Sequence, residues 1–149
     1  MRITTALAGA IVALSATPLY LAHAQYAPAT KLALGQKAPY GKYLTDGNGR
    51  ALYMFTADKK GRSTCDSACA EAWPPLTSGG QVSAGAGLIK AKIGHATRVG
   101  GEQQVTYNGM PLYYFARDQT AGSAAGEDIK AYGGTWYLVS PAGQKIDVD

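Results

Sequence analysis

The sequence contains few of the residues that build metal, haem or nucleophilic centres. It has two histidines and two cysteines in 149 residues. The pair Cys65 and Cys69 lacks both the spacing and the following histidine of a haem-attachment motif, and it also differs from the spacing of thiol oxidoreductases. A zinc site needs three or four ligands, which this composition does not supply. We therefore expect no cofactor.

Charged residues are also scarce, at 16% of the chain, and the formal net charge is only +4. The basic residues are dispersed except for Lys59, Lys60 and Arg62. A surface that tracks nucleic-acid phosphates needs more positive charge than this, so nucleic acid is not an expected partner. The basic trio is typical of a solvated turn, with contact to anionic envelope polymers or lipid headgroups as the alternative.

Long apolar runs are absent, and the longest apolar stretch lies at the N-terminus. Residues 1–24 have the features of a secretory signal peptide, with Arg2, an apolar stretch and a small-x-small site at Ala22-His23-Ala24. No cysteine near this site could accept a lipid. We predict cleavage after Ala24, a mature chain with no transmembrane segment or lipid anchor, and a periplasmic or secreted location.

The two cysteines are expected to pair, because exported proteins meet an oxidising environment. Cys65-x3-Cys69 closes a very short loop, so the predicted disulfide stabilises mainly the local turn. Residues 66–73 are predicted to form a short helix that ends before Pro74-Pro75.

What the chain does contain is one motif written twice. Gly49 to Asp58 returns as Gly109 to Asp118, with an offset of 60 residues and a shared Leu-Tyr-x-Phe-x-x-Asp core. An internal repeat of this kind predicts two copies of one supersecondary unit. The residues predicted to form the structural motif are Tyr53, Phe55, Asp58, Tyr113, Phe115 and Asp118.

The pattern of short apolar segments and glycine-rich turns predicts a mainly β fold. We expect a two-repeat antiparallel sandwich or small barrel, with one short helix near the cysteine pair. Residues 25–39 are predicted to be a flexible N-terminal arm, and residues 40–149 a single domain with repeats at about 40–96 and 97–149. Strands are predicted at 40–45, 51–57, 97–99, 103–107, 110–117, 135–140 and 145–148, and a long polar loop at 119–133. Hairpins are predicted between 40–45 and 51–57 and between 97–99 and 103–107, and Asn108-Gly109 is predicted to form a two-residue hairpin turn.

The repeated aspartates follow the ends of the motif strands, where a carboxylate can accept backbone N–H bonds and fix the loop that follows. A buried tyrosine hydroxyl needs a partner, and we expect this to be backbone or the aspartate of the same repeat. The alternative is that the two Tyr/Asp sets converge on one polar site, as an acid/base couple or a site for a hard cation.

Several motifs together resemble one known family. The resemblance rests on the two Leu-Tyr-x-Phe-x-x-Asp copies, the cysteine pair, Trp73-Pro74-Pro75-Leu76 and Trp136-Tyr137. These residues resemble the bacterial secreted repeats described as predicted lipoproteins with a Yx(FWY)xxD motif, over residues 40 to 146. The resemblance implies a secreted repeat of unknown function. The sequence departs from the label because it lacks a lipobox cysteine.

The composition favours an exported, non-catalytic β-rich module that binds an envelope component or a protein partner, and no catalytic residue is predicted. One alternative is a metal- or redox-linked protein that uses His95 with Met54 or Met110, or the repeated aspartates. Another is a hydrolase, which would need Asp58 or Asp118 in a cleft with a raised pKa. Exposed aromatic residues could instead form a ligand-binding platform, and the candidates are Tyr107, Tyr114 and Tyr132.

Overall fold

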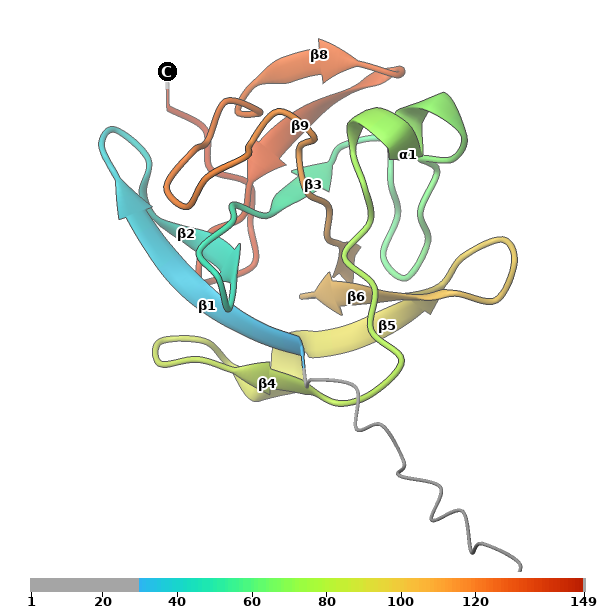
Figure 1. Cartoon of the computed structure of the whole chain (residues 1–149), viewed down its shortest axis with the longest axis horizontal. Helices are drawn as coiled ribbons and strands as arrows, with labels where there is room; N and C mark the ends of the chain where they lie inside the picture. The colour runs from blue at the N-terminus through green and yellow to red at the C-terminus, as the bar shows by residue number, and fades with distance from the viewer. Residues whose placement is uncertain (1–29, 149) are drawn as a thin grey trace, which may run out of the picture.

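The computed structural model describes residues 30–148. The predicted signal peptide and residues 25–29 of the predicted arm lie outside this range. Within the described residues the fold consists of three small sheets, one short helix and one 3-10 turn (Figure 1). The elements are β1 (Thr30–Lys37), β2 (Gly41–Asp46), β3 (Tyr53–Phe55), α1 (Ala68–Ala72), β4 (Val82–Ala84), the 3-10 turn η1 (Lys90–Lys92), β5 (Ile93–Thr97), β6 (Gln103–Tyr107), β7 (Met110–Pro111), β8 (Ile129–Ala131) and β9 (Gly134–Leu138).

Each sheet has three strands, in the orders β2-β1-β4, β3-β9-β8 and β5-β6-β7. All strand pairs are antiparallel except β1 with β4. The prediction of a mainly β fold with a short helix beside the cysteine pair is confirmed. Within residues 30–148 the sheets form no closed barrel.

The predicted flexible arm of residues 25–39 is wrong where the structure describes it. Residues 30–37 form β1, which pairs with β2 on one side and β4 on the other. Leu32 is fully buried, and Leu34 packs against the same core cluster. The prediction failed because the Ala/Pro-rich sequence before β1 obscures the alternating leucines that bury one face of the strand.

The two predicted hairpins have different outcomes. The first one, between 40–45 and 51–57, is reduced to a single bridge between Thr45 and Ala51, because β3 pairs with β9 instead. The second forms between β5 and β6, but its first strand is Ile93–Thr97 and not the predicted 97–99, which lies mostly in the turn. A two-residue turn then joins β6 to β7, with φ of 52° at Asn108 and 82° at Gly109, as this type of hairpin requires. The predicted loop at 119–133 contains β8.

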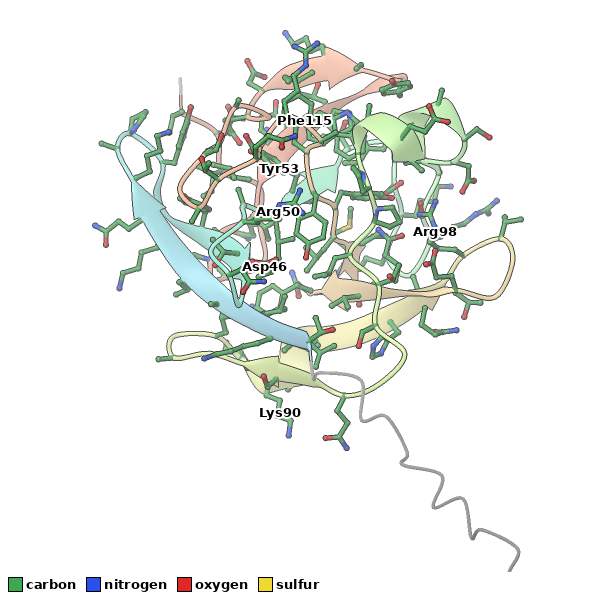
Figure 2. The ribbon with its side chains drawn as sticks, viewed as in Figure 1. Asp46, Arg50, Tyr53, Lys90, Arg98 and Phe115 are labelled. Atoms are coloured by element: carbon green, nitrogen blue, oxygen red, sulfur yellow. A yellow bond between two sulfur atoms is a disulfide. The ribbon has the colours of Figure 1, made fainter. Side chains whose placement is uncertain are left out.

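The interior holds a continuous stack of four aromatic rings. Phe55 stacks on Trp136 at 4.1 Å between ring centroids, Trp136 on Trp73 at 4.0 Å, and Trp73 on Phe115 at 4.3 Å. Tyr53 meets Trp73 edge-on, and Figure 2 shows Tyr53 and Phe115 inside the molecule. Because each ring of the stack is at most 7% exposed, the column forms a large part of the apolar core.

Candidate functional site

The two repeats are interlocked through their motif strands. Tyr53 and Tyr113 form an antiparallel bridge, with N···O distances of 2.8 Å from Tyr53 to Tyr113 and 3.0 Å in the reverse direction. On its other side Tyr53 pairs with Leu138, whereas Tyr113 pairs with Pro75. Each motif strand therefore lies between the motif strand and the tryptophan-bearing segment of the other repeat.

The tyrosine hydroxyls repeat this exchange. Tyr53 Oη donates to Asp118 Oδ2 at 2.5 Å, and Tyr113 Oη donates to Asp58 Oδ2 at 2.6 Å. We expected each hydroxyl to bond backbone or the aspartate of its own repeat, and the aspartate that it bonds belongs instead to the other repeat. The motif strands run antiparallel, so the chain that leaves each strand passes beside the tyrosine of the other one.

Each aspartate also holds the loop that follows its strand. Asp58 Oδ1 accepts hydrogen bonds from the backbone N–H of Thr64 at 2.7 Å and from its hydroxyl at 2.9 Å. Asp118 Oδ1 accepts from the Ser123 hydroxyl at 2.7 Å and from the Ala125 N–H at 2.9 Å. All four carboxylate oxygens are thus engaged within the protein.

Burial is the largest influence on the pKa of Asp58 and of both motif tyrosines. It raises the pKa of the Asp58 carboxyl, while hydrogen bonds from Tyr113 and Thr64 and the charge of Arg98 lower it. Burial and the aspartate partners raise the pKa of both motif tyrosines, which therefore stay neutral donors.

The pairs are enclosed and already satisfied, which is unlike a reactive carboxylate in an open cleft. Asp58 is 7% exposed and Asp118 is 1% exposed. Asp58 and Asp118 bond separate sets of residues. This arrangement gives no support to the hypotheses of an acid/base couple, a hydrolase or a site for a hard cation. Among residues 30–148, no three His, Cys, Asp or Glu side chains gather as metal ligands.

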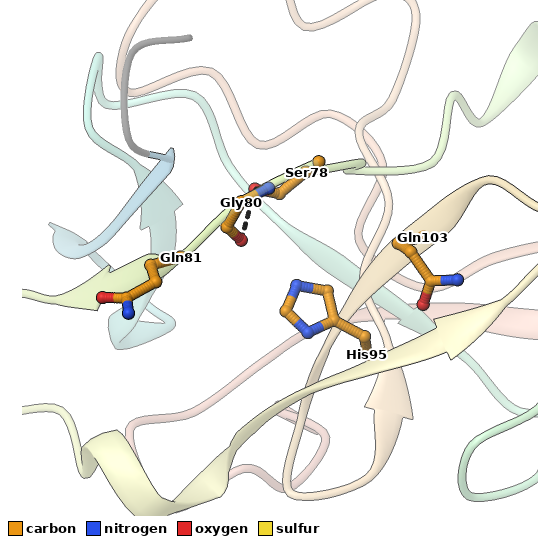
Figure 3. Close-up of a pocket in the computed structure, with 6 residues that line it drawn as sticks. Ser78, Gly80, Gln81, His95 and Gln103 are labelled. Atoms are coloured by element: carbon orange, nitrogen blue, oxygen red, sulfur yellow. Dashed lines mark hydrogen bonds between the residues drawn. The ribbon is translucent and has the colours of Figure 1, made fainter. Parts of the chain in front are cut away.

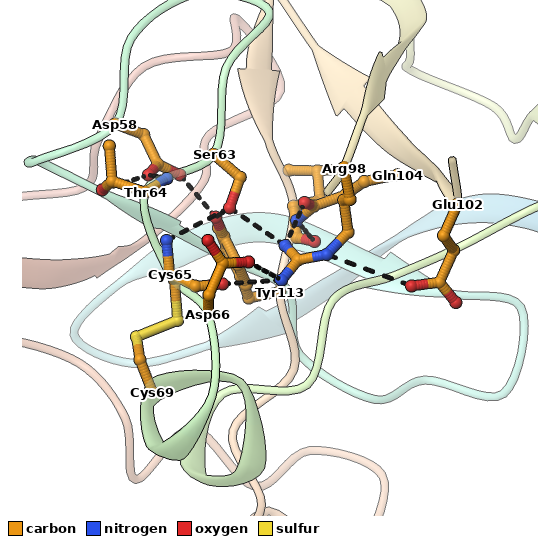
Figure 4. A network of polar contacts seen from close by, with 11 residues as sticks. Asp58, Ser63, Thr64, Cys65, Asp66, Cys69, Arg98, Glu102, Gln104 and Tyr113 are labelled. Atoms are coloured by element: carbon orange, nitrogen blue, oxygen red, sulfur yellow. Dashed lines mark hydrogen bonds and ion pairs between the residues drawn. A yellow bond between two sulfur atoms is a disulfide. The ribbon is translucent and has the colours of Figure 1, made fainter. Parts of the chain in front are cut away.

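A buried guanidinium ties the second repeat to the loop that carries the disulfide (Figure 4). The Arg98 side chain is 6% exposed. It donates to Ser63 Oγ at 2.9 Å, Gln104 Oε1 at 2.8 Å, the Cys65 carbonyl at 2.6 Å and Asp66 Oδ1 at 2.9 Å. The Ser63 hydroxyl also lies 2.7 Å from the Tyr113 hydroxyl oxygen and donates to it, since the tyrosine proton goes to Asp58, so Arg98 belongs to the network around Asp58.

Sequence reasoning missed Arg98, because nothing in its local pattern distinguishes it from a surface arginine. The Cys65–Cys69 disulfide is confirmed, and both sulfur residues are buried. The loop that presents hydrogen-bond acceptors to Arg98 is therefore also the loop that the disulfide closes.

An open surface groove of about 380 Å³ lies between residues 78–81 and β5 (Figure 3). His95 is exposed on β5, and its imidazole points toward the segment that carries Ser78 and Gly80. The lining consists of Ser78, Gly79, Gly80, Gln81, His95 and Gln103. The groove thus offers hydroxyl, amide, imidazole and backbone groups.

The predicted aromatic platform does not form. Tyr107 is fully buried, donates to the Pro141 carbonyl at 2.9 Å and accepts from the Ile89 N–H at 3.1 Å. It faces inward because β6 is covered by other chain segments. Tyr114 lies under the Arg50 guanidinium at 4.2 Å and donates to Asp46 Oδ2 at 3.0 Å.

The remaining candidates are dispersed. Tyr132 is 50% exposed in the turn between β8 and β9. Met110 is half-buried in β7, and Met54 packs against the core. Neither methionine lines the groove that contains His95, so the structure does not assemble the proposed His/Met set.

Comparison with known proteins identifies the repeat. A family model described as a secreted repeat of unknown function matches residues 36–77 and 94–140. No curated protein and no solved structure matches the chain. None of the helices within residues 30–148 has the length and apolar character needed to cross a bilayer. The two matched segments contain the motif strands and the tryptophan-bearing segments that pair with each other across the repeats. The chain belongs to this family of secreted repeats of unknown function.

Proposed function

We propose that the protein is an exported, non-catalytic recognition module that binds an extended segment of a protein partner in the groove beside β5. The observation that carries this proposal is a difference between the polar groups of the repeat motif and those of the groove. The motif carboxylates and hydroxyls are buried and bonded to one another. The groove is open, and its lining includes the side chains of Ser78, Gln81, His95 and Gln103.

The groove suits an extended, uncharged chain. None of its six lining residues carries a permanent charge, which argues against an anionic polymer as the ligand. A Cβ added at Gly79 or Gly80 would meet no heavy atom within 4 Å, so the wall of the groove is uncrowded. Backbone groups can therefore be approached closely there.

Strand β5 supplies a second recognition element. It is the terminal strand of its sheet, and β6 is its neighbour there. A terminal strand presents backbone donors and acceptors on one edge, and extended peptides commonly bind by adding to such an edge. Side chains of the bound segment would then meet His95 and Gln81.

Site-specific photo-crosslinking in cells that export the full chain tests this function. A photoreactive phenylalanine analogue replaces Gln81 in the groove, and the matched control carries it at the exposed Lys130 on β8. We expect a polypeptide adduct from position 81 that is absent from position 130, with a lower yield when His95→Ala is added. Equal labelling at both positions, or an adduct that contains glycan without polypeptide, would contradict the proposal.

A further inference from the structure

Glu127 is a half-buried carboxyl group that the repeat motif does not require. It lies in the turn before β8, and its Oε2 accepts a hydrogen bond from the Leu138 N–H of β9 at 2.5 Å. Its other oxygen, Oε1, is buried and has no hydrogen-bond partner among the described residues. An ionised carboxylate in this position loses hydration that the protein does not replace.

The first repeat has no need for such an acceptor. Leu138 pairs with Tyr53, and the residue that pairs in the same way with Tyr113 is Pro75. Proline has no N–H, so at the position that corresponds to Leu138 the first repeat has no backbone donor for a carboxylate to accept from. Glu127 is therefore a feature of the second repeat alone.

The charged neighbours of Glu127 are mostly of the same sign. Asp128 and Asp147 oppose its ionisation, and Lys145 favours it. Lys145 also donates to Asp147, so its charge is shared between two carboxylates. Tyr53 faces Glu127 as a neutral hydroxyl that is already bonded to Asp118.

We propose that Glu127 is a proton-responsive latch that holds the turn before β8 against strand β9. In the protonated form the carboxyl keeps the Leu138 N–H bond without burying an unsolvated charge, and the latch is closed. Ionisation places a charge on the partnerless oxygen beside two aspartates, and the latch loosens.

The direction of the pH dependence follows from proton binding. Burial is the main cause that raises the pKa of Glu127 from 4.5 to about 7, and the Leu138 N–H opposes it. Between these values the folded state holds a proton that the unfolded state has lost. Stability from this group is therefore full below pH 4.5 and is lost as the pH rises through about 7.

The direct test is an NMR titration of the side-chain carboxyl carbons of the mature protein, with hydrogen-exchange protection of the Leu138 amide measured alongside. We expect one glutamate to titrate near pH 7. Protection of Leu138, corrected for the intrinsic exchange rate, should fall several-fold through the same interval. Titration of Glu127 near 4.5, or constant protection from pH 5 to pH 8, would overturn the proposal.

The variant Glu127→Gln separates the latch from general acid effects, because its amide oxygen can still accept from Leu138 without a charge. Its denaturation midpoint should match that of the wild type near pH 5 and exceed it at pH 8. The control Glu71→Gln, at an exposed position on α1, should follow the wild type throughout. A Glu127→Gln profile parallel to the wild type would also reject the latch, and the carboxyl titration decides the matter if this variant does not fold.

Discussion

The two buried tyrosine–aspartate pairs share one geometry but have different surroundings. The Asp58 site contains Tyr113, a disulfide-closed loop and the Arg98 guanidinium. The Asp118 site contains Tyr53, the Gly126 N–H and the additional acid Glu127. At both sites the carboxylate accepts a hydrogen bond from a tyrosine hydroxyl of the other repeat. It also accepts hydrogen bonds from the loop that follows its own strand.

The comparison distinguishes the contacts that both sites share from those that only one site has. Exchange of tyrosines between repeats is common to both sites and interlocks the fold. The first site balances its buried carboxylate with a buried cation, which lowers the pKa of Asp58 against the effect of burial. The second site adds a further carboxyl instead, Glu127, whose pKa is raised by burial to about 7.

The largest expected effect concerns what the two sites share. Trp73→Ala and Trp136→Ala should each lower the free energy of unfolding by about 3–5 kcal/mol, because each removes a central ring of the stack and leaves a cavity. Urea denaturation measures both. A loss below about 1 kcal/mol for one of them would show that the stack is not shared equally by the repeats.

Arg98 should matter only at the Asp58 site. Arg98→Met should cost about 3 kcal/mol, because it leaves the buried acceptors Gln104 and the Cys65 carbonyl without their donor. It should also raise the pKa of Asp58 further, since it removes the favourable charge. The control is Arg117→Met, at an exposed position. Equal losses of unfolding free energy for both variants would show that Arg98 has no special role at the Asp58 site.

The disulfide should contribute less than Arg98. Replacing both Cys65 and Cys69 with alanine should lower the free energy of unfolding by about 2 kcal/mol, because the closed loop is very short. Denaturant unfolding of the double variant measures this. Failure of the double variant to fold would mean that the first repeat depends on its covalent link far more than its geometry suggests.

The smallest effect on stability is expected for a substitution of His95 in the groove. His95 pairs with Val105 on β6 as Leu34 pairs with Leu44 on β2. Leu34→Ala should cost about 1 kcal/mol, since its side chain packs on the core. His95→Ala should change stability by less than about 0.5 kcal/mol, because the imidazole is exposed. A destabilising His95→Ala in thermal melts would make the groove a structural feature.

Local chemistry was predictable from the sequence. The Asn108-Gly109 turn and the Cys65–Cys69 pair each depend on neighbouring residues and on general rules of backbone and redox chemistry. The constant offset of the repeat indicated that both copies use the same residues.

The long-range features were not predictable in this way. A repeat shows which residues recur, but not whether a tyrosine bonds the aspartate of its own copy or of the other. Arg98 and Glu127 depend on contacts with segments distant in sequence. Tyr107 was mistaken for an exposed residue because the burial of β6 depends on those same distant segments.

The central claim is that the repeats exchange their tyrosines, and double-mutant cycles test it most directly. One cycle combines Tyr53→Phe with Asp118→Asn, and the other combines Tyr53→Phe with Asp58→Asn, each measured by urea denaturation. We predict a coupling free energy of about 1–2 kcal/mol between Tyr53 and Asp118, whose atoms share a buried hydrogen bond. Coupling between Tyr53 and Asp58 should stay below about 0.5 kcal/mol. The opposite result, with strong coupling inside the first repeat and none across the repeats, would contradict the exchange.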